Sequence, residues 1–190
     1  MEAIINEVLI DADVIFHLLV TDSFSKISEI LHPYKCIVID LVYEEVCRKP
    51  LCKSLLDTHF KSKNIFLEEF DNNDIEIKKE FALLKRKPLL GPGEIACMAR
   101  AKFKGNTIAS SNFRDTKHYC QEHKIPLIGT LDILYISLHK NIFSIDQCDE
   151  IISNAIQFNK ALFPESVMKF KQISYYEPDE YSLKSIELFL

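Results

Sequence analysis

The stretch that most constrains the fold runs from Leu89 to Asp115, and it reads as a turn, a helix, a buried strand and a polar loop. The breaker cluster Gly91-Pro92-Gly93 predicts that a helix begins there, with Glu94 in its first turn. Gly105-Asn106 is a typical stop signal for that helix. Apolar residues at helical spacing predict a core-facing side, made of Ile95, Met98, Ala99 and Phe103.

A strand and a loop follow this helix. Thr107-Ile108-Ala109 is short and apolar, which predicts a buried strand. Ser110-Ser111-Asn112 then opens a polar loop that ends at Asp115. One carboxylate, Glu94, therefore opens a helix, and another lies just past the carboxyl end of the next strand. Ligands of open α/β sheets bind in the crevice outside those strand ends.

Short apolar runs alternate with helical patterns along the whole chain. We predict strands at 8–10, 36–40, 65–67, 107–109 and 125–128, and helices at 14–20, 23–31, 41–48, 51–60, 72–85, 94–104, 116–123, 131–139 and 145–158. Ile4-Ile5 either belongs to the first strand or precedes it. This alternation predicts a three-layer α/β/α domain around a mainly parallel sheet. We assign it to residues 1–162, with a C-terminal extension at 163–190 that packs on the domain or contacts a partner.

Composition excludes several classes of protein. The sequence has no run of 18 apolar residues, so we predict no membrane span. The first residues lack the pattern of a secretory signal. Six cysteines without a C-x-x-C pair favour reduced thiols, so we expect a cytoplasmic protein. The net charge of −5 argues against a broadly basic nucleic-acid surface, but it is compatible with a small acidic site that holds a cation.

Four carboxylates map to one edge of the predicted sheet. Asp11 ends the first strand, Glu44 or Glu45 lies in the helix after the second strand, and Glu94 and Asp115 flank the fourth strand. Converging carboxylates repel one another unless divalent cations lie between them, and ligand sets made only of oxygen suit Mg²⁺ or Mn²⁺. Helix capping alone also favours acidic residues at such positions, and that interpretation stays open for each of them.

Five segments resemble the successive motifs of PIN-domain nucleases. They are VLIDADVI at 8–15, VYEEV at 42–46, LGPGEIACMA at 90–99, ASSNFRD at 109–115 and IPLIGTL at 125–131. The resemblance covers about residues 7–160 and implies a PIN-like fold and metal-dependent hydrolysis of RNA phosphodiesters, leaving a 5′-phosphate and a 3′-hydroxyl. Many members are VapC-type toxins that a cognate antitoxin holds inactive, and many dimerise, so the resemblance also implies an antitoxin partner and a homodimer.

The resemblance also implies the residues of the site. By motif match Asp11, Glu45, Glu94 and Asp115 would bind Mg²⁺ or Mn²⁺, with Glu45 preferred to Glu44 because it directly precedes the apolar Val46.

Two positions depart from the family pattern. Asp13 stands where a small hydroxyl or amide residue is common. It either adds charge to the site or caps the helix, and we favour the cap. Ser111-Asn112 stands where many relatives carry an adjacent acidic pair, which leaves Asp115 as the only carboxylate of that motif. A second hypothesis is therefore a catalytically degenerate PIN-like module that binds RNA or a protein partner. A third, weaker one is a phosphatase or a DNA-directed nuclease on a similar scaffold.

Three further residues near these motifs have simpler interpretations. Asp132 is expected to cap a helix rather than to bind a metal. Phe113-Arg114 lies beside Asp115, and we suggest that this pair stacks on or positions a nucleobase.

Overall fold

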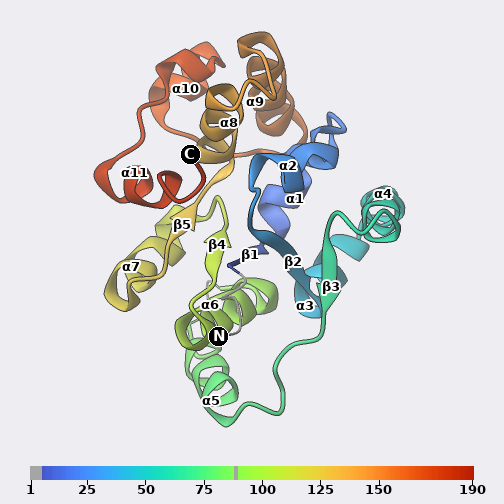
Figure 1. Cartoon of the computed structure of the whole chain (residues 1–190), viewed down its shortest axis with the longest axis vertical. Helices are drawn as coiled ribbons and strands as arrows, with labels where there is room; N and C mark the ends of the chain where they lie inside the picture. Colours follow the sequence, from blue (N-terminus) through green and yellow to red (C-terminus); the bar gives the residue numbers. More distant parts are fainter. Residues whose placement is uncertain (1–5, 88–89) are drawn as a thin grey trace.

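The structure is a computed structural model that describes residues 6–87 and 90–190, and it is an α/β fold, as predicted. Ile4-Ile5 and Leu89 lie outside the described residues. Five strands form one all-parallel sheet: β1 Glu7–Ile10, β2 Lys35–Ile39, β3 Phe66–Glu68, β4 Thr107–Ala109 and β5 Leu127–Ile128. Their order across the sheet is β3-β2-β1-β4-β5 (Figure 1).

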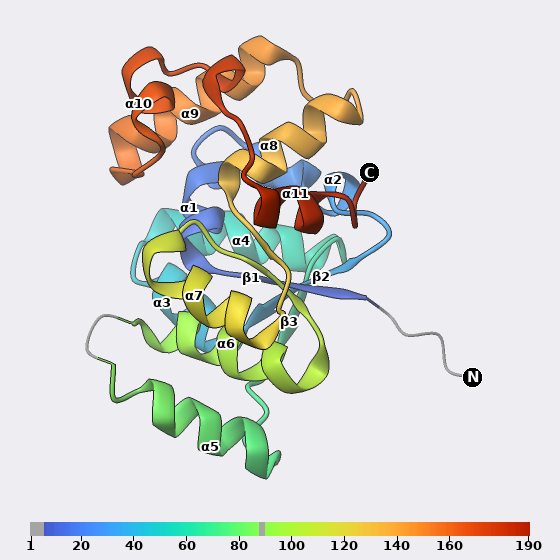
Figure 2. The ribbon, with the colours of Figure 1, turned by 90° about the vertical axis from the view of Figure 1, so that its left-hand side faces the viewer.

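Helices cover both faces of this sheet. Their bounds are α1 Ala12–Leu19, α2 Ile27–Ile30, α3 Asp40–Cys47, α4 Pro50–Lys61, α5 Ile75–Leu84, α6 Pro92–Lys104, α7 Phe113–His123, α8 Thr130–His139, α9 Ile145–Asn159, α10 Glu165–Phe170 and α11 Glu180–Ile186, with short 3₁₀ helices at Ser23–Lys26 and Ile173–Tyr175. Figure 2 shows α8 and α11 above the strands and α6 below them, with α5 outside α6. The result is the predicted three-layer α/β/α arrangement. No helix in the described part of the chain is long and apolar enough to cross a membrane.

The strand order places a topological switch point between β1 and β4. These neighbours pair in parallel with Val8 opposite Thr107 and Ile10 opposite Ala109. From β1 the chain continues to β2 on one side, whereas β4 continues to β5 on the other side. The connections therefore leave these two strand ends in opposite directions, which opens a crevice at their carboxyl ends. Asp11, whose backbone N–H donates to Ala109 O over 2.9 Å, lies at that crevice.

Three local predictions were wrong. Helix α7 begins at Phe113, so Asp115 lies in its first turn and not in the loop before it. Strand β5 is limited to two residues, since Pro126 has no N–H with which to extend the ladder. Phe103 is 43% exposed, although we predicted it to be buried, because it lies in the last turn of α6, beyond the buried segment 93–101.

Helix α6 packs unusually closely against α3. A Cβ atom at Gly93 would lie 2.9 Å from Val42 Cγ2 and 3.1 Å from Val42 Cα, which is closer than side chains tolerate. Glycine therefore allows the first turn of α6 to approach α3. This contact positions the next residue, Glu94, at the carboxyl edge of the sheet.

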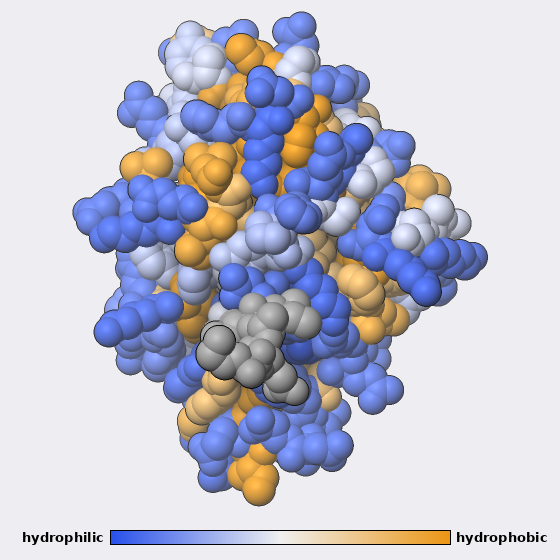
Figure 3. All heavy atoms as spheres, viewed as in Figure 1, coloured by the Kyte–Doolittle hydropathy of each residue, from blue (hydrophilic) through white to orange (hydrophobic). Residues whose placement is uncertain are grey.

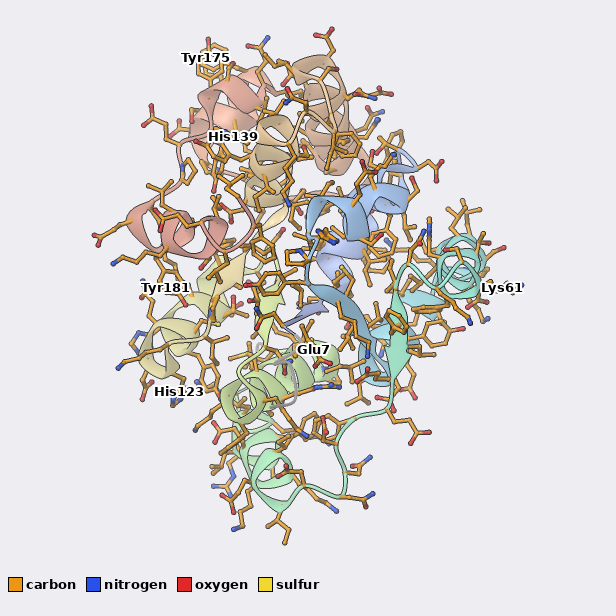
Figure 4. The ribbon with its side chains drawn as sticks, viewed as in Figure 1. Glu7, Lys61, His123, His139, Tyr175 and Tyr181 are labelled. Atoms are coloured by element: carbon orange, nitrogen blue, oxygen red, sulfur yellow. The ribbon has the colours of Figure 1, made fainter. Side chains whose placement is uncertain are left out.

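The C-terminal segment 163–190 packs on the domain and covers the edge strand β5. Leu127 N donates to Ser185 Oγ over 3.1 Å, and the Tyr181 hydroxyl donates to Ile125 O. Figure 4 shows Tyr181 beside β5. Ile186 is buried. Because these groups take up donors and acceptors along β5, the tail protects an edge that would otherwise be open to pairing with another chain.

A buried arginine joins α6 to the sheet. The Arg100 side chain is 7% exposed, and its Nη2 atom lies 2.7 Å from Glu68 Oε2 and 3.3 Å from Glu7 Oε2. Figure 4 shows Glu7 next to α6. Hydrophilic residues dominate the face seen in Figure 3, with smaller hydrophobic patches among them.

Candidate metal and nuclease site

Asp11 is held in one orientation at the end of β1. Its Oδ1 atom accepts from Ala12 N over 2.8 Å, and its Oδ2 atom accepts from Ser110 Oγ over 3.0 Å. The residue is 6% exposed, and this burial raises the pKa of its carboxyl to about 6. Asp11 therefore caps α1 and also presents a buried carboxyl at the switch point.

Asp13 belongs to the same cluster, which corrects our interpretation of it as the helix cap. The residue that caps α1 is Asp11, and Asp13 lies in the first turn. Asp13 Oδ2 accepts from Ser111 N over 2.8 Å, so the carboxyl points at the loop after β4. Burial, together with the charge of Asp11, raises the pKa of Asp13 well above its usual range.

Glu94 approaches from the opposite side of the crevice. It lies in the first turn of α6, is 6% exposed, and accepts from Asn112 Nδ2 at Oε1 over 2.8 Å. Burial, followed by the charge of Asp11, raises the pKa of Glu94 to about 8. A buried glutamate of this kind binds a proton near neutral pH unless a cation replaces that proton.

Glu45 and Asp115 lie at the margin of this group of carboxyls. Glu45 is half-buried, whereas Glu44 is exposed, and a Cβ atom at Gly91 would lie 3.6 Å from Glu45 Oε2. The charge of Glu45 raises the pKa of Asp11. Asp115 raises the pKa of Glu94, but to a smaller extent than Asp11 does.

We call these five carboxylates the acidic site: Asp11, Asp13, Glu45, Glu94 and Asp115. The four predicted residues therefore lie at one edge of the sheet, and Asp13 joins them. Besides burial itself, the main groups that shift the pKa values of Asp11, Asp13 and Glu94 are other carboxyls and hydrogen-bond donors, not lysine or arginine. Within residues 6–87 and 90–190, no three acidic, histidine or cysteine side chains stand close enough together to hold a metal ion as they are arranged here. The all-oxygen donor set nevertheless fits Mg²⁺ or Mn²⁺ in its chemistry.

A chain of hydrogen bonds leads from the acidic site to a buried histidine that we did not predict. Ser111 Oγ lies 2.7 Å from Thr130 Oγ1, which lies 2.8 Å from His17 Nδ1. Burial lowers the pKa of His17 to about 4, so the imidazole is neutral at pH 7. The sequence signal for this series of hydrogen bonds is that His17 follows Asp13 by four residues, which places both on one face of α1.

Asp132 lies in the first turn of α8 and bonds back to the N-cap residue Gly129, so its role at the start of the helix is structural. Its Oδ2 atom accepts from Gly129 N over 2.7 Å, and its Oδ1 atom accepts from the Tyr176 hydroxyl. Burial raises the pKa of Asp132 to about 6.

No family model, no curated protein and no solved structure matches this chain. The function is therefore inferred from the sequence motifs and from the residues and geometry of the site.

Proposed function

We propose that this chain is a PIN-like, metal-dependent endoribonuclease whose acidic site holds a divalent cation. The observation that carries the proposal is the gathering of buried carboxyls, without a basic partner among their main neighbours, at the switch point between β1 and β4. Ionised carboxylates in such a site repel one another, and a divalent cation offsets that repulsion. Ligand binding outside the carboxyl ends of the strands at a switch point is the general rule for open α/β sheets.

In this proposal Asp11, Glu45, Glu94 and Asp115 hold Mg²⁺ or Mn²⁺, which supplies the positive charge needed to activate a water and to stabilise the leaving oxygen of a phosphodiester. The other groups keep the carboxylates in position. Ser110 Oγ orients Asp11, and Asn112 Nδ2 orients Glu94. Such hydrogen bonds to ligand carboxylates are typical of metal sites in proteins.

RNA as the substrate, a role as the toxin of a toxin–antitoxin or defence pair, an antitoxin partner and a homodimer all rest on the motif resemblance. Activity on RNA in preference to DNA is the first of these to test, because the fold alone does not determine the substrate.

A catalytically degenerate module that binds RNA or a protein partner is the alternative. The observation that favours it is that the neutral Asn112 is the group in contact with Glu94, at a position where many PIN relatives carry an acid. A site with fewer carboxylates binds divalent cations more weakly.

Calorimetric titration with Mn²⁺ separates the two proposals. For an active site we expect saturable binding that is weakened by Asp115→Ala and by Glu45→Ala. Glu44→Ala is the matched control for Glu45→Ala, because Glu44 is the exposed neighbour on the same helix and should leave binding unchanged. Absence of binding by the unaltered protein favours the degenerate module. Cleavage of single-stranded RNA, single-stranded DNA and a phosphomonoester, measured side by side, then defines the substrate class.

A further inference from the structure

A pocket of about 330 Å³ is connected to the acidic site through Ser111, which lines the pocket and bonds Asp13. It is enclosed by the start of α7, the turn between β5 and α8, and the C-terminal segment. Its lining includes Ser111, Phe113, Lys117, Thr130, Phe163 and Tyr176. We propose that this pocket binds one unstacked nucleobase of a single-stranded RNA whose backbone passes the acidic site. This inference rests on the proposed nuclease function and adds to it a binding subsite for the substrate.

The walls of the pocket suit a flat aromatic ligand. Phe113, Phe163 and Tyr176 contribute three rings to its lining, and Leu131 and Leu162 add aliphatic surface. Bases of single-stranded nucleic acids stack on such rings with little dependence on sequence, because every base has a π-face. A volume of about 330 Å³ is at the lower end of small-molecule pockets, which fits one nucleoside and not a duplex.

The ring of Phe113 is held in place by the turn beneath it. A Cβ atom at Gly129 would lie 2.4 Å from Phe113 Cε2, so the ring rests directly on the glycine backbone. Only glycine at this position leaves room for the ring. The ring is therefore packed on one side before any ligand binds, and such prior positioning lowers the entropic cost of binding.

Polar groups supply contacts for the edge and the backbone of a nucleotide. The hydroxyls of Ser111 and Thr130 line the pocket and bond each other over 2.7 Å, so a base edge that reaches them joins a hydrogen-bond network that is already formed. Lys117 Nζ lies 5.9 Å from the centre of the Phe113 ring, where its charge attracts a phosphate. Lys117 is also paired with Asp179, a residue of the C-terminal segment.

Ser111 connects the pocket to the acidic site. Its side chain lines the pocket, and its backbone N–H donates to Asp13 Oδ2 over 2.8 Å. A nucleotide whose base enters the pocket therefore has its phosphate beside the acidic site. The C-terminal segment thus contributes one wall of a substrate-binding pocket, in addition to covering β5.

Base binding can be measured without catalysis. The probe is an RNA tetranucleotide with one 2-aminopurine base, titrated in EDTA so that no metal-dependent cleavage occurs. The chain contains no tryptophan, so the protein contributes little background fluorescence. We expect saturable quenching by the unaltered protein. An unlabelled oligonucleotide with an abasic site in place of 2-aminopurine should displace this probe about tenfold more weakly than the same oligonucleotide with an adenine there.

Two pairs of variants test the location. Phe113→Ala should weaken binding about tenfold, whereas Phe158→Ala, on an exposed ring of α9, should not. Leu162→Glu places a negative charge at the pocket, and Leu51→Glu is its matched control, because these leucines are 84% and 72% exposed and neither substitution threatens folding.

Each outcome has one consequence. The pocket is supported if Phe113→Ala and Leu162→Glu lose binding while the controls Phe158→Ala and Leu51→Glu keep it. The pocket proposal is overturned if the unaltered protein causes no quenching, or if neither Phe113→Ala nor Leu162→Glu changes the quenching. In both cases the nuclease proposal is still decided by the cleavage assay. Base binding without any metal-dependent cleavage keeps the pocket and overturns the nuclease.

Discussion

Asn112 Nδ2 donates to Glu94 Oε1 over 2.8 Å, and this bond joins the loop after β4 to the first turn of α6. The two residues are 18 positions apart in the chain, with the rest of α6 and all of β4 between them. The bond holds a buried carboxyl toward the switch point, where its pKa is raised. The charge at position 112 therefore influences both the stability of the metal-free protein and its affinity for a cation.

Asn112→Asp should destabilise the metal-free protein and strengthen Mn²⁺ binding about tenfold. The substitution removes the donor to Glu94 and adds a like charge, which costs about 1–3 kcal/mol. It also adds a ligand oxygen to the acidic site. Urea unfolding and calorimetry measure the two effects. Asn112→Ala is the control, since it loses the same hydrogen bond without adding a ligand and should not strengthen binding. Weaker binding by Asn112→Asp would argue against a metal at this site.

Asp11→Asn should abolish RNA cleavage while the melting temperature stays close to that of the unaltered protein. The amide keeps an oxygen that accepts from Ala12 N, so the helix cap survives. The matched control is Asp40→Asn, because Asp40 follows the neighbouring strand β2 and accepts from Leu41 N in the same way, outside the acidic site. Retained cleavage by Asp11→Asn would refute the assignment of the site.

The metal-free protein should lose stability as the pH rises from 7 to 8.5. The pKa of Glu94 is about 8 in the folded protein, above its ordinary value of 4.5, so over much of this range the folded state binds more protons than the unfolded state. The slope cannot exceed about 1.4 kcal/mol per pH unit for one such group. His17 is neutral above pH 7 in both states and does not oppose the trend.

Thermal unfolding in EDTA at several pH values measures this loss. Glu94→Gln should flatten the dependence, because it removes the titrating group. Saturating Mg²⁺ should raise the melting temperature more at pH 8.5 than at pH 7, since the cation competes with a proton for the same carboxyl. A metal effect that does not depend on pH would place the cation away from Glu94.

Gly93→Ala should destabilise the protein by about 2 kcal/mol, although alanine is the better helix former. The gain in helix propensity is about 1 kcal/mol, but the new methyl group would lie 2.9 Å from Val42 Cγ2 and force α6 away from α3. Gly91→Ala is the control, since its methyl group would meet only ordinary contact at 3.6 Å from Glu45 Oε2. Because Glu94 moves with α6, Gly93→Ala should also weaken Mn²⁺ binding. Equal stabilities of the two variants would mean that the helices separate without cost.

Arg100→Met should cost about 3 kcal/mol, and the loss should be larger at pH 8 than at pH 4. Burial raises the pKa of the Glu68 carboxyl, but hydrogen bonds from Lys35 and Arg100 lower it by more. The net pKa of Glu68 therefore lies below its ordinary value. Removal of the arginine takes away a positive charge that offsets the repulsion between the Glu68 and Glu7 carboxylates. Protonation of these carboxylates at low pH relieves that repulsion.

Urea unfolding at the two pH values provides the test. Lys79→Met removes an exposed ion pair with Glu76 on α5, and it should change stability by less than about 1 kcal/mol. An equally small effect of Arg100→Met would show that the buried network contributes no net stability.

The chain's local patterns determined the class of fold and the identity of most of the acidic site. Asp11 and Glu94 were predicted because strand ends and helix starts can be read from apolar spacing and breakers, and parallel strands bring such positions to one edge. The choice of Glu45 over Glu44 came from the motif resemblance, and in the structure Glu45 faces the site while Glu44 is exposed.

Tertiary structure alone decided which groups touch one another. Asp13 could be a cap or a member of the cluster, and only the donor at Ser111 N, 98 positions away in the chain, decides its orientation. Phe103 has the correct helical spacing for burial, but in the structure it is 43% exposed in the last turn of α6. The pocket needs residues 162–182 to fold back over α7 and α8. Local spacing determines which face of an element is apolar, but long-range packing determines what covers it, and that depends on contacts that no local pattern contains.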